Sequence, residues 1–164
     1  MTKDETGGTL FDKLAEAGAK LLVETLPHIF DGTAVYEKQP EESPTPYAGM
    51  ITKQMGLINF GKSAAELERL VRGLNPWPSA FTFWNGKTLK VWESFVVKSE
   101  EAGTEKPEPG TVVKTDKKGI YVACGEDVLV LSQVQLEGKK RMDADAFLRG
   151  CHIETGSRFT DKKE

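Results

Sequence analysis

The chain has 164 residues, is 38% hydrophobic and 29% charged, and carries a formal net charge of −3 at pH 7. This composition is typical of an ordinary water-soluble globular protein, and no apolar run approaches the roughly 20 residues needed to cross a bilayer, so we expect a cytoplasmic protein with no membrane partner. Its 2 cysteines and 2 histidines are too few for a disulfide framework or a recognisable zinc site, so we expect reduced thiols and no metal.

The first element that the sequence predicts is a helix within residues 1–30. Thr9 can cap its N-terminus, with Asp12 reaching back from the third helical position. Apolar residues then recur at helical spacing, at Leu10, Phe11, Leu14, Ala15, Leu21, Leu22 and Leu26. An apolar face this broad must be buried against another element, and no predicted strand precedes the helix to provide that surface. We therefore interpret residues 1–30 as the last helix of a domain that is otherwise missing.

Residues 31–47 are predicted to be a linker between domains. This stretch is acidic and contains Pro40, Pro44 and Pro46, which deny a regular ladder of backbone donors. The second domain is then expected to occupy residues 48–164.

That domain is predicted to begin with a short amphipathic helix. Ser63 and Glu66 have the spacing of a capping box. The apolar stripe that follows consists of Leu67, Leu70, Val71 and Leu74. Gly73 lies near the expected end of the helix, and Pro76 and Pro78 prevent its continuation.

Beyond this helix the sequence predicts five short strands. Residues 80–84 and 89–97 are rich in aromatic and β-branched residues and flank Asn85-Gly86, the best signal for a tight hairpin turn in the chain. A polar loop is expected at 99–109. The remaining strands are predicted at 110–114, 120–124 and 128–134.

Strands of this number and spacing favour a small barrel, because closing the sheet removes its exposed edges. The predicted fold class is mainly β with accessory helices: a five-stranded OB-like barrel preceded by an isolated helix and a Pro-rich linker. A short capping helix is expected at 143–149, ended by Gly150.

Charge is unevenly distributed along the chain. Residues 1–47 and, more weakly, 99–164 are acidic, whereas 48–98 carry more Lys and Arg than Glu. Such a basic block fits a polyanion site, and a solvated surface without function explains it equally well.

The segment 72–82, Arg-Gly-Leu-Asn-Pro-Trp-Pro-Ser-Ala-Phe-Thr, resembles the signature of the methionyl-tRNA formyltransferase C-terminal domain. Further matching segments follow the family's order, at 6–14, 47–60, 109–111 and 136–142. Gln54 and Asn59 depart from the family pattern, where acidic residues are expected.

The resemblance implies a two-domain enzyme that moves a formyl group from 10-formyltetrahydrofolate to the methionine amino group of initiator tRNA in translation initiation. A Rossmann-like N-terminal domain in cis would hold the folate pocket and the catalytic Asn, His and Asp. Residues 1–30 would be its trailing helix, and 48–164 an OB-like tRNA-binding domain. Neither His28 nor His152 matches the catalytic histidine, so we expect no catalytic residue and no cofactor in this chain. We also expect a monomer.

The candidate tRNA-binding residues are Arg72, Lys87, Lys90, Lys139, Lys140 and Arg141. OB-like folds recurrently bind oligonucleotides through cations and stacking aromatics.

Local sequence patterns indicate each of these candidates. Lys87 and Lys90 alternate with Leu89 and Val91, which predicts both lysines on the face opposite the core. The run 139–141 is expected in a loop near a barrel mouth.

Arg72 shares a predicted helical face with Arg69. Among the tryptophans, Trp77 is expected to plug the barrel or pack on the preceding helix rather than stack on a base. Trp84 and Trp92 fit either role.

Two other functions stay open. The chain could be an accessory domain of another formyl-handling enzyme, such as a formyltetrahydrofolate hydrolase or dehydrogenase or a sugar-nucleotide formyltransferase. It could also be a free-standing OB-like adaptor. The segment 138–142 resembles the tRNA enzyme best, and the unpaired apolar helix argues against a complete adaptor.

Overall fold

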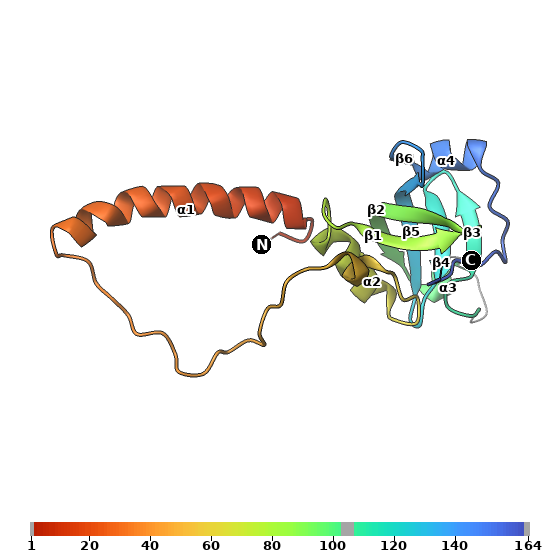
Figure 1. Ribbon diagram of the computed structural model, residues 1–164. Helices are drawn as coiled ribbons and strands as arrows, with labels where there is room; N and C mark the ends of the chain where they lie inside the picture. The colour runs from red at the N-terminus through yellow and green to blue at the C-terminus, as the bar shows by residue number, and fades with distance from the viewer. Residues whose placement is uncertain (1, 103–106, 163–164) are drawn as a thin grey trace.

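A long helix, an extended segment and a β-rich domain follow one another along the chain (Figure 1). This computed structural model describes residues 2–102 and 107–162. Within these ranges, no helix is long and apolar enough to span a membrane.

Helix α1 spans Gly7–Phe30 and is capped by Thr6 rather than by the predicted Thr9. Thr9 is instead the third helical residue: its backbone N–H donates to the Thr6 hydroxyl at 3.2 Å, and its own hydroxyl accepts from the Thr6 N–H at 3.0 Å. This reciprocal pair satisfies two otherwise free donors, so the helix begins earlier than the Thr9–Asp12 pattern suggested.

The first turn of α1 and the residue before its N-cap contact the β-rich domain. The Gly8 N–H donates to the Asn75 carbonyl at 2.8 Å, and Arg72 Nη1 donates to the Glu5 carbonyl at 2.8 Å. A Cβ atom on Gly7 would lie 2.4 Å from the Gly73 carbonyl oxygen, so this close approach requires glycine.

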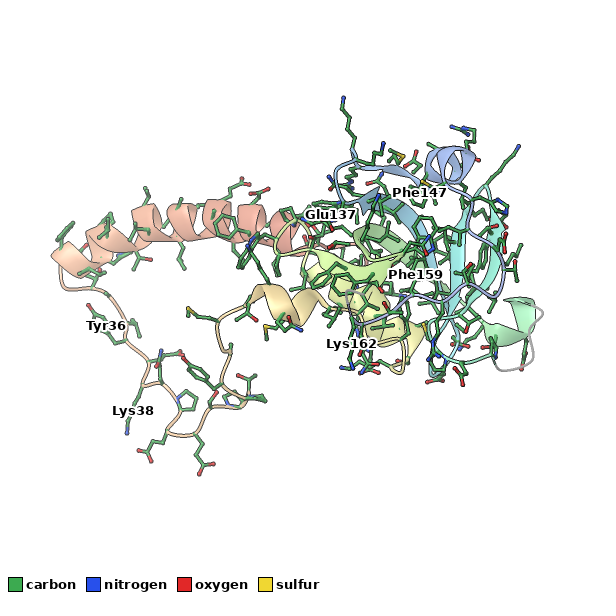
Figure 2. All side chains as sticks on the ribbon, turned by 45° about the vertical axis from the view of Figure 1, so that its right-hand side comes forward. Tyr36, Lys38, Glu137, Phe147, Phe159 and Lys162 are labelled. Atoms are coloured by element: carbon green, nitrogen blue, oxygen red, sulfur yellow. The ribbon has the colours of Figure 1, made fainter. Side chains whose placement is uncertain are left out.

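Beyond this contact α1 projects away from the domain (Figure 1). No residue of α1, all of which the structure describes, is buried, and most of its apolar residues are exposed, Phe11 by 72%. Residues 31–52 contain no helix or strand and return to the domain; Figure 2 shows Tyr36 and Lys38 on this segment. The domain boundary stays a prediction.

Helix α2 spans Ala64–Gly73 and follows a short 3-10 helix, η1, at Lys53–Gly56. The predicted capping box is confirmed: the Glu66 N–H donates to the Ser63 hydroxyl and the Ser63 N–H donates to the Glu66 carboxylate, both at 3.3 Å. Leu67 and Val71 are buried.

The sheet is antiparallel, with strand order β1-β2-β5-β4-β3. Its strands are β1 Ala80–Trp84, β2 Lys87–Val97, β3 Val112–Asp116, β4 Gly119–Ala123 and β5 Val128–Leu136. A short additional strand, β6 at Met142–Asp143, was not predicted and pairs with β5.

The predicted hairpin between β1 and β2 is confirmed. Asn85 and Gly86 both have positive φ, 48° and 69°, as a two-residue turn of this kind requires. Strand β2 begins directly after the turn, at Lys87, two residues before the predicted start.

The C-terminal segment 156–160 fills the gap between β1 and β3. The Phe83 N–H donates to the Thr160 carbonyl at 3.0 Å, and the Val112 N–H donates to the Ser157 carbonyl at 2.8 Å. Phe159 is 3% exposed and stacks on Phe60 with ring centroids 6.2 Å apart. The barrel-like sheet is compatible with the predicted OB-like fold, and its closure uses a segment for which no strand was predicted.

One main core lies inside this sheet, sealed by helix α4 at Ala144–Gly150. Figure 2 shows Phe147 of α4 and Phe159 of the closing segment within the domain. Inside the loop predicted at 99–109, the structure has a one-turn helix, α3 at Ser99–Ala102; positions 103–106 lie outside the described residues.

Candidate nucleic-acid interface

The centre of the candidate interface is Trp92, which lies at a β-bulge in β2. Val91 pairs with Val134 and Glu93 with Gln133, so Trp92 is an extra residue on its strand. Its carbonyl, displaced from the ladder, accepts a hydrogen bond of 3.0 Å from the Asn75 side chain.

Two of the candidate cations lie over the Trp92 ring. Arg141 Cζ is 4.7 Å from the ring centroid and Lys90 Nζ is 5.7 Å from it. Both distances fall within the range of cation–π attraction. The structure therefore brings together one cation from β2 and one from the turn that follows β5, which are far apart in sequence.

Two glutamines of β5 connect this ring and these cations to their surroundings. Trp92 Nε1–H donates to Gln135 Oε1 at 3.1 Å, and Gln135 Nε2 donates to the Lys139 carbonyl at 2.9 Å. Arg141 Nε donates to Gln133 Oε1, and Gln133 Nε2 donates to Asp143 Oδ1 at 3.1 Å.

Lys139 and Lys140 lie in a loop, as predicted, and this loop is the turn that connects β5 to β6. Gly138 starts it with a φ of 77°, and the Lys139 N–H donates back to the Leu136 carbonyl at 2.9 Å. Both lysines are exposed. We call Lys90, Trp92, Lys139, Lys140 and Arg141 the Trp92 cluster.

Acidic side chains adjoin the Trp92 cluster. Arg141 Nη2 forms an ion pair with Glu93 Oε1 at 3.1 Å, in which both side chains are about half exposed. The Glu137 carboxylate accepts from the Thr88 N–H at 3.0 Å. These groups reduce the positive potential of the cluster without cancelling its exposed lysines.

Lys87 departs from the predicted arrangement. Because it lies three residues before Lys90, the two-residue period of a strand cannot place both on one face. Lys90 alternates with buried Leu89 and Val91, but Lys87 falls on the same side as they do. It is exposed nevertheless, because it is the first residue after the hairpin turn.

Arg72 is engaged away from the Trp92 cluster, at the junction of α1 and α2. Its Nε donates to Glu68 Oε1 at 2.5 Å and its Nη1 to the Glu5 carbonyl, and its side chain is 28% exposed. These contacts give Arg72 a structural task; its role in RNA binding stays a prediction.

Trp77 does not plug the barrel, because the residue is 59% exposed; its packing on the preceding helix stays a prediction. Trp84 packs against the main core instead, in edge-to-face contact with Phe147 at a centroid distance of 6.2 Å. Trp84 is thus a packing residue, whereas Trp92 is the tryptophan that lies among cations.

Cys124 and His152 lie outside the Trp92 cluster. Burial raises the pKa of the Cys124 thiol to about 12, so this group stays protonated and unreactive near neutral pH. His152 is highly exposed and lies 3.7 Å from the Glu154 carboxylate.

Comparison with known sequences identifies the family. The sequence model described as formyl transferase, C-terminal domain, matches residues 50–152. Over 160 residues the chain is 53% identical to the methionyl-tRNA formyltransferase of Agathobacter rectalis, and over 150 residues it is 47% identical to that of Bacillus subtilis. These matches cover 98% and 91% of this chain but 50% and 46% of the two relatives, so the chain spans about half their length.

Solved structures support the fold. HypX from Aquifex aeolicus, in complex with tetrahydrofolic acid, matches with a TM-score of 0.62 at 11% identity, over 90% of this chain and 25% of that one. A variant of HypX matches with a TM-score of 0.59 at 14% identity, over 97% of this chain and 29% of the variant. At such low identity the likeness concerns the fold alone. The family match and the sequence identities together show that the chain belongs to the methionyl-tRNA formyltransferase family and carries its C-terminal domain.

Proposed function

We propose that residues 48–164 bind initiator methionyl-tRNA and position it for N-formylation during translation initiation in the cytoplasm. The formyl group would come from 10-formyltetrahydrofolate, and a Rossmann-like domain in the same polypeptide would transfer it. The observation that carries the proposal is the Trp92 cluster, in which cations from two distant segments surround one ring on a single surface.

The chemistry of the cluster suits a phosphate backbone. Each lysine or arginine that meets a phosphate releases condensed counterions, and this release supplies affinity that depends little on base sequence. Arg141 and Lys90 also lie against the Trp92 ring, which favours contacts with backbone phosphates over stacking of a base on that ring. Arg72 and Lys87 would add support from outside the cluster. Because acidic groups such as Glu93 lie nearby, we expect micromolar affinity or weaker.

Helix α1 supplies the connection to catalysis in this proposal. Its exposed apolar side chains, among them Phe11, Leu14, Leu21 and Leu22, would pack on the domain that performs the transfer. Burying such side chains is favourable by about 1.5 to 3 kcal/mol each. We assign no residue of this chain to the formyl donor or to the chemical step.

The proposal is tested by measuring two properties of the purified chain. Fluorescence anisotropy with labelled initiator tRNA should show weak binding at low salt, and an assay with 10-formyltetrahydrofolate and methionyl-tRNA should show no transfer. If the chain does not bind tRNA at low salt, the positioning role is wrong. Turnover by the isolated chain would instead refute the assignment of the chemistry to another domain.

A further inference from the structure

We propose that Gln133 and Gln135 are positioning residues, which hold the basic turn 138–141 against Trp92 in the arrangement that phosphate binding uses. The inference rests on the proposed tRNA-binding function, and it concerns two uncharged side chains that would not themselves touch RNA. They lie two residues apart on β5 and are both half-buried, whereas Val134 and Leu136, which alternate with them, are buried, so both glutamines project from the outward face of the sheet.

Gln135 connects the ring to the turn. Its amide oxygen accepts from the Trp92 indole N–H at 3.1 Å, and its amide nitrogen donates to the Lys139 carbonyl at 2.9 Å. The side chain therefore fixes the edge of the ring and the backbone of the turn at the same time. Lys90 reinforces this arrangement, because it is the cross-strand partner of Gln135 and also lies over the ring.

Gln133 performs the corresponding task at the other end of the turn. Its amide oxygen accepts from Arg141 Nε, and its amide nitrogen donates to Asp143 Oδ1 at 3.1 Å. Arg141 Nη2 contacts Glu93, the cross-strand partner of Gln133. The guanidinium is thereby held over Trp92 before any RNA arrives.

An exposed position on a strand does not by itself require glutamine. These two positions need a side chain as long as glutamine that offers both a hydrogen-bond donor and an acceptor, and glutamine does so without charge. Glutamate would retain the acceptor but lose the donor and add a negative charge beside the cations. Methionine has similar length and volume and would lose both hydrogen bonds.

Preorganisation and charge have different signatures in a binding experiment. A loosened turn keeps all its cations, so the dependence of affinity on salt is unchanged. Affinity itself falls, because binding then includes the entropic cost of ordering the side chains of the turn. Removing a cation that meets a phosphate lowers the slope of log K against log salt by about 0.7 to 0.9. A positioning residue and a phosphate-binding residue can therefore be told apart.

The experiment compares the wild-type chain with Gln135→Met, with Arg141→Ala and with a matched control, Gln39→Met, which changes an exposed glutamine of the linker. Initiator tRNA is titrated into each protein at several salt concentrations. For Gln135→Met we expect affinity about three- to tenfold weaker with an unchanged salt slope, from the ordering cost of one or two side chains. Arg141→Ala should weaken binding with a smaller slope, and Gln39→Met should match the wild type.

A second measurement, on the free proteins, does not depend on tRNA. In ¹H–¹⁵N spectra, Gln135→Met should shift the Trp92 indole N–H signal and lower the backbone order parameters of Lys139 and Lys140. Unchanged order in the turn, or tRNA affinity equal to the wild type, would overturn the positioning role. Failure of the wild-type chain itself to bind tRNA would overturn the proposed function, and the order parameters would still decide whether Gln135 holds the turn.

Discussion

The side-chain amide of Asn75 donates a hydrogen bond of 3.0 Å to the carbonyl oxygen of Trp92. This bond joins the segment 72–82, by which the sequence resembles its family, to the bulge at the centre of the candidate interface. The same Asn75 accepts the Gly8 N–H through its own carbonyl, so it also contacts the start of α1.

The Asn75 bond should be measurable in the stability of the chain. Asn75→Ala leaves the bulged Trp92 carbonyl without its donor, and we expect the free energy of unfolding to fall by about 1 to 3 kcal/mol. Urea unfolding followed by circular dichroism measures this loss. The control Gln54→Ala, at an exposed position, should change stability by less than about 0.5 kcal/mol. Equal urea midpoints for Asn75→Ala and the control would show that the bond contributes nothing.

The two leucines of the α2 stripe should differ in their effect. Leu67 is 1% exposed in the core, whereas Leu70 is only partly buried at its margin. We expect Leu67→Ala to cost about 2 to 5 kcal/mol through lost burial and a residual cavity, and Leu70→Ala to cost less. Denaturant melts of both variants check this order, and a larger loss at Leu70 would mean that the buried face of α2 is assigned wrongly.

The ion pair between Lys98 and Asp127 predicts a pH dependence. The ammonium of Lys98, 2.8 Å from the carboxylate, holds the pKa of Asp127 below its usual value. A carboxyl group with a lowered folded pKa stabilises the fold above its unfolded pKa of about 3.9, and this contribution is lost as the pH falls through the folded value.

Asp127→Asn should therefore lower the urea midpoint at pH 7, and the gap from the wild type should shrink as the pH falls below about 4. Asparagine is the suitable replacement because Asp127 has a φ of 63°, which asparagine also tolerates. Urea melts from pH 7 to pH 2.5 measure the gap. A gap of constant size over this range would exclude the carboxylate as its source.

Closure of the sheet by the C-terminal segment can be tested at Phe159. This side chain is 3% exposed and stacks on Phe60, so Phe159→Ala should cost about 3 to 5 kcal/mol. Thermal or urea unfolding measures the loss, with the exposed Lys162→Ala as its control. If Phe159→Ala is as stable as that control, residues 156–160 do not belong to the folded sheet.

Local chemistry explains which parts of the fold could be predicted. The Ser63–Glu66 capping box and the Asn85-Gly86 turn depend on residues a few positions apart, so the sequence pattern contains the whole interaction. The Thr9–Asp12 pattern predicts Thr9 as the cap of α1, whereas the structure uses Thr6, whose partner at the third helical position is the hydroxyl of Thr9.

Interactions between distant segments explain what was missed. The closing segment 156–160 has weak strand propensity and is held by β1 and β3, so nothing local marks it. At the candidate interface, local patterns indicate the cations within each segment, but the bulge at Trp92 and the bridges through Gln133 and Gln135 come from pairing between β2 and β5. A signal for the glutamines was present in the alternation of polar and apolar residues at 133–136.

The central claim is that the cations of the Trp92 cluster bind tRNA through its phosphates. The most direct measurement titrates initiator tRNA into the wild-type chain and into a variant with Lys139, Lys140 and Arg141 all changed to alanine, each at two salt concentrations about fourfold apart. With roughly three to five phosphate contacts, wild-type affinity should fall on the order of 20-fold or more between them. The variant should bind more weakly at low salt and with a smaller salt slope. Equal affinity and an unchanged slope in the variant would contradict the account.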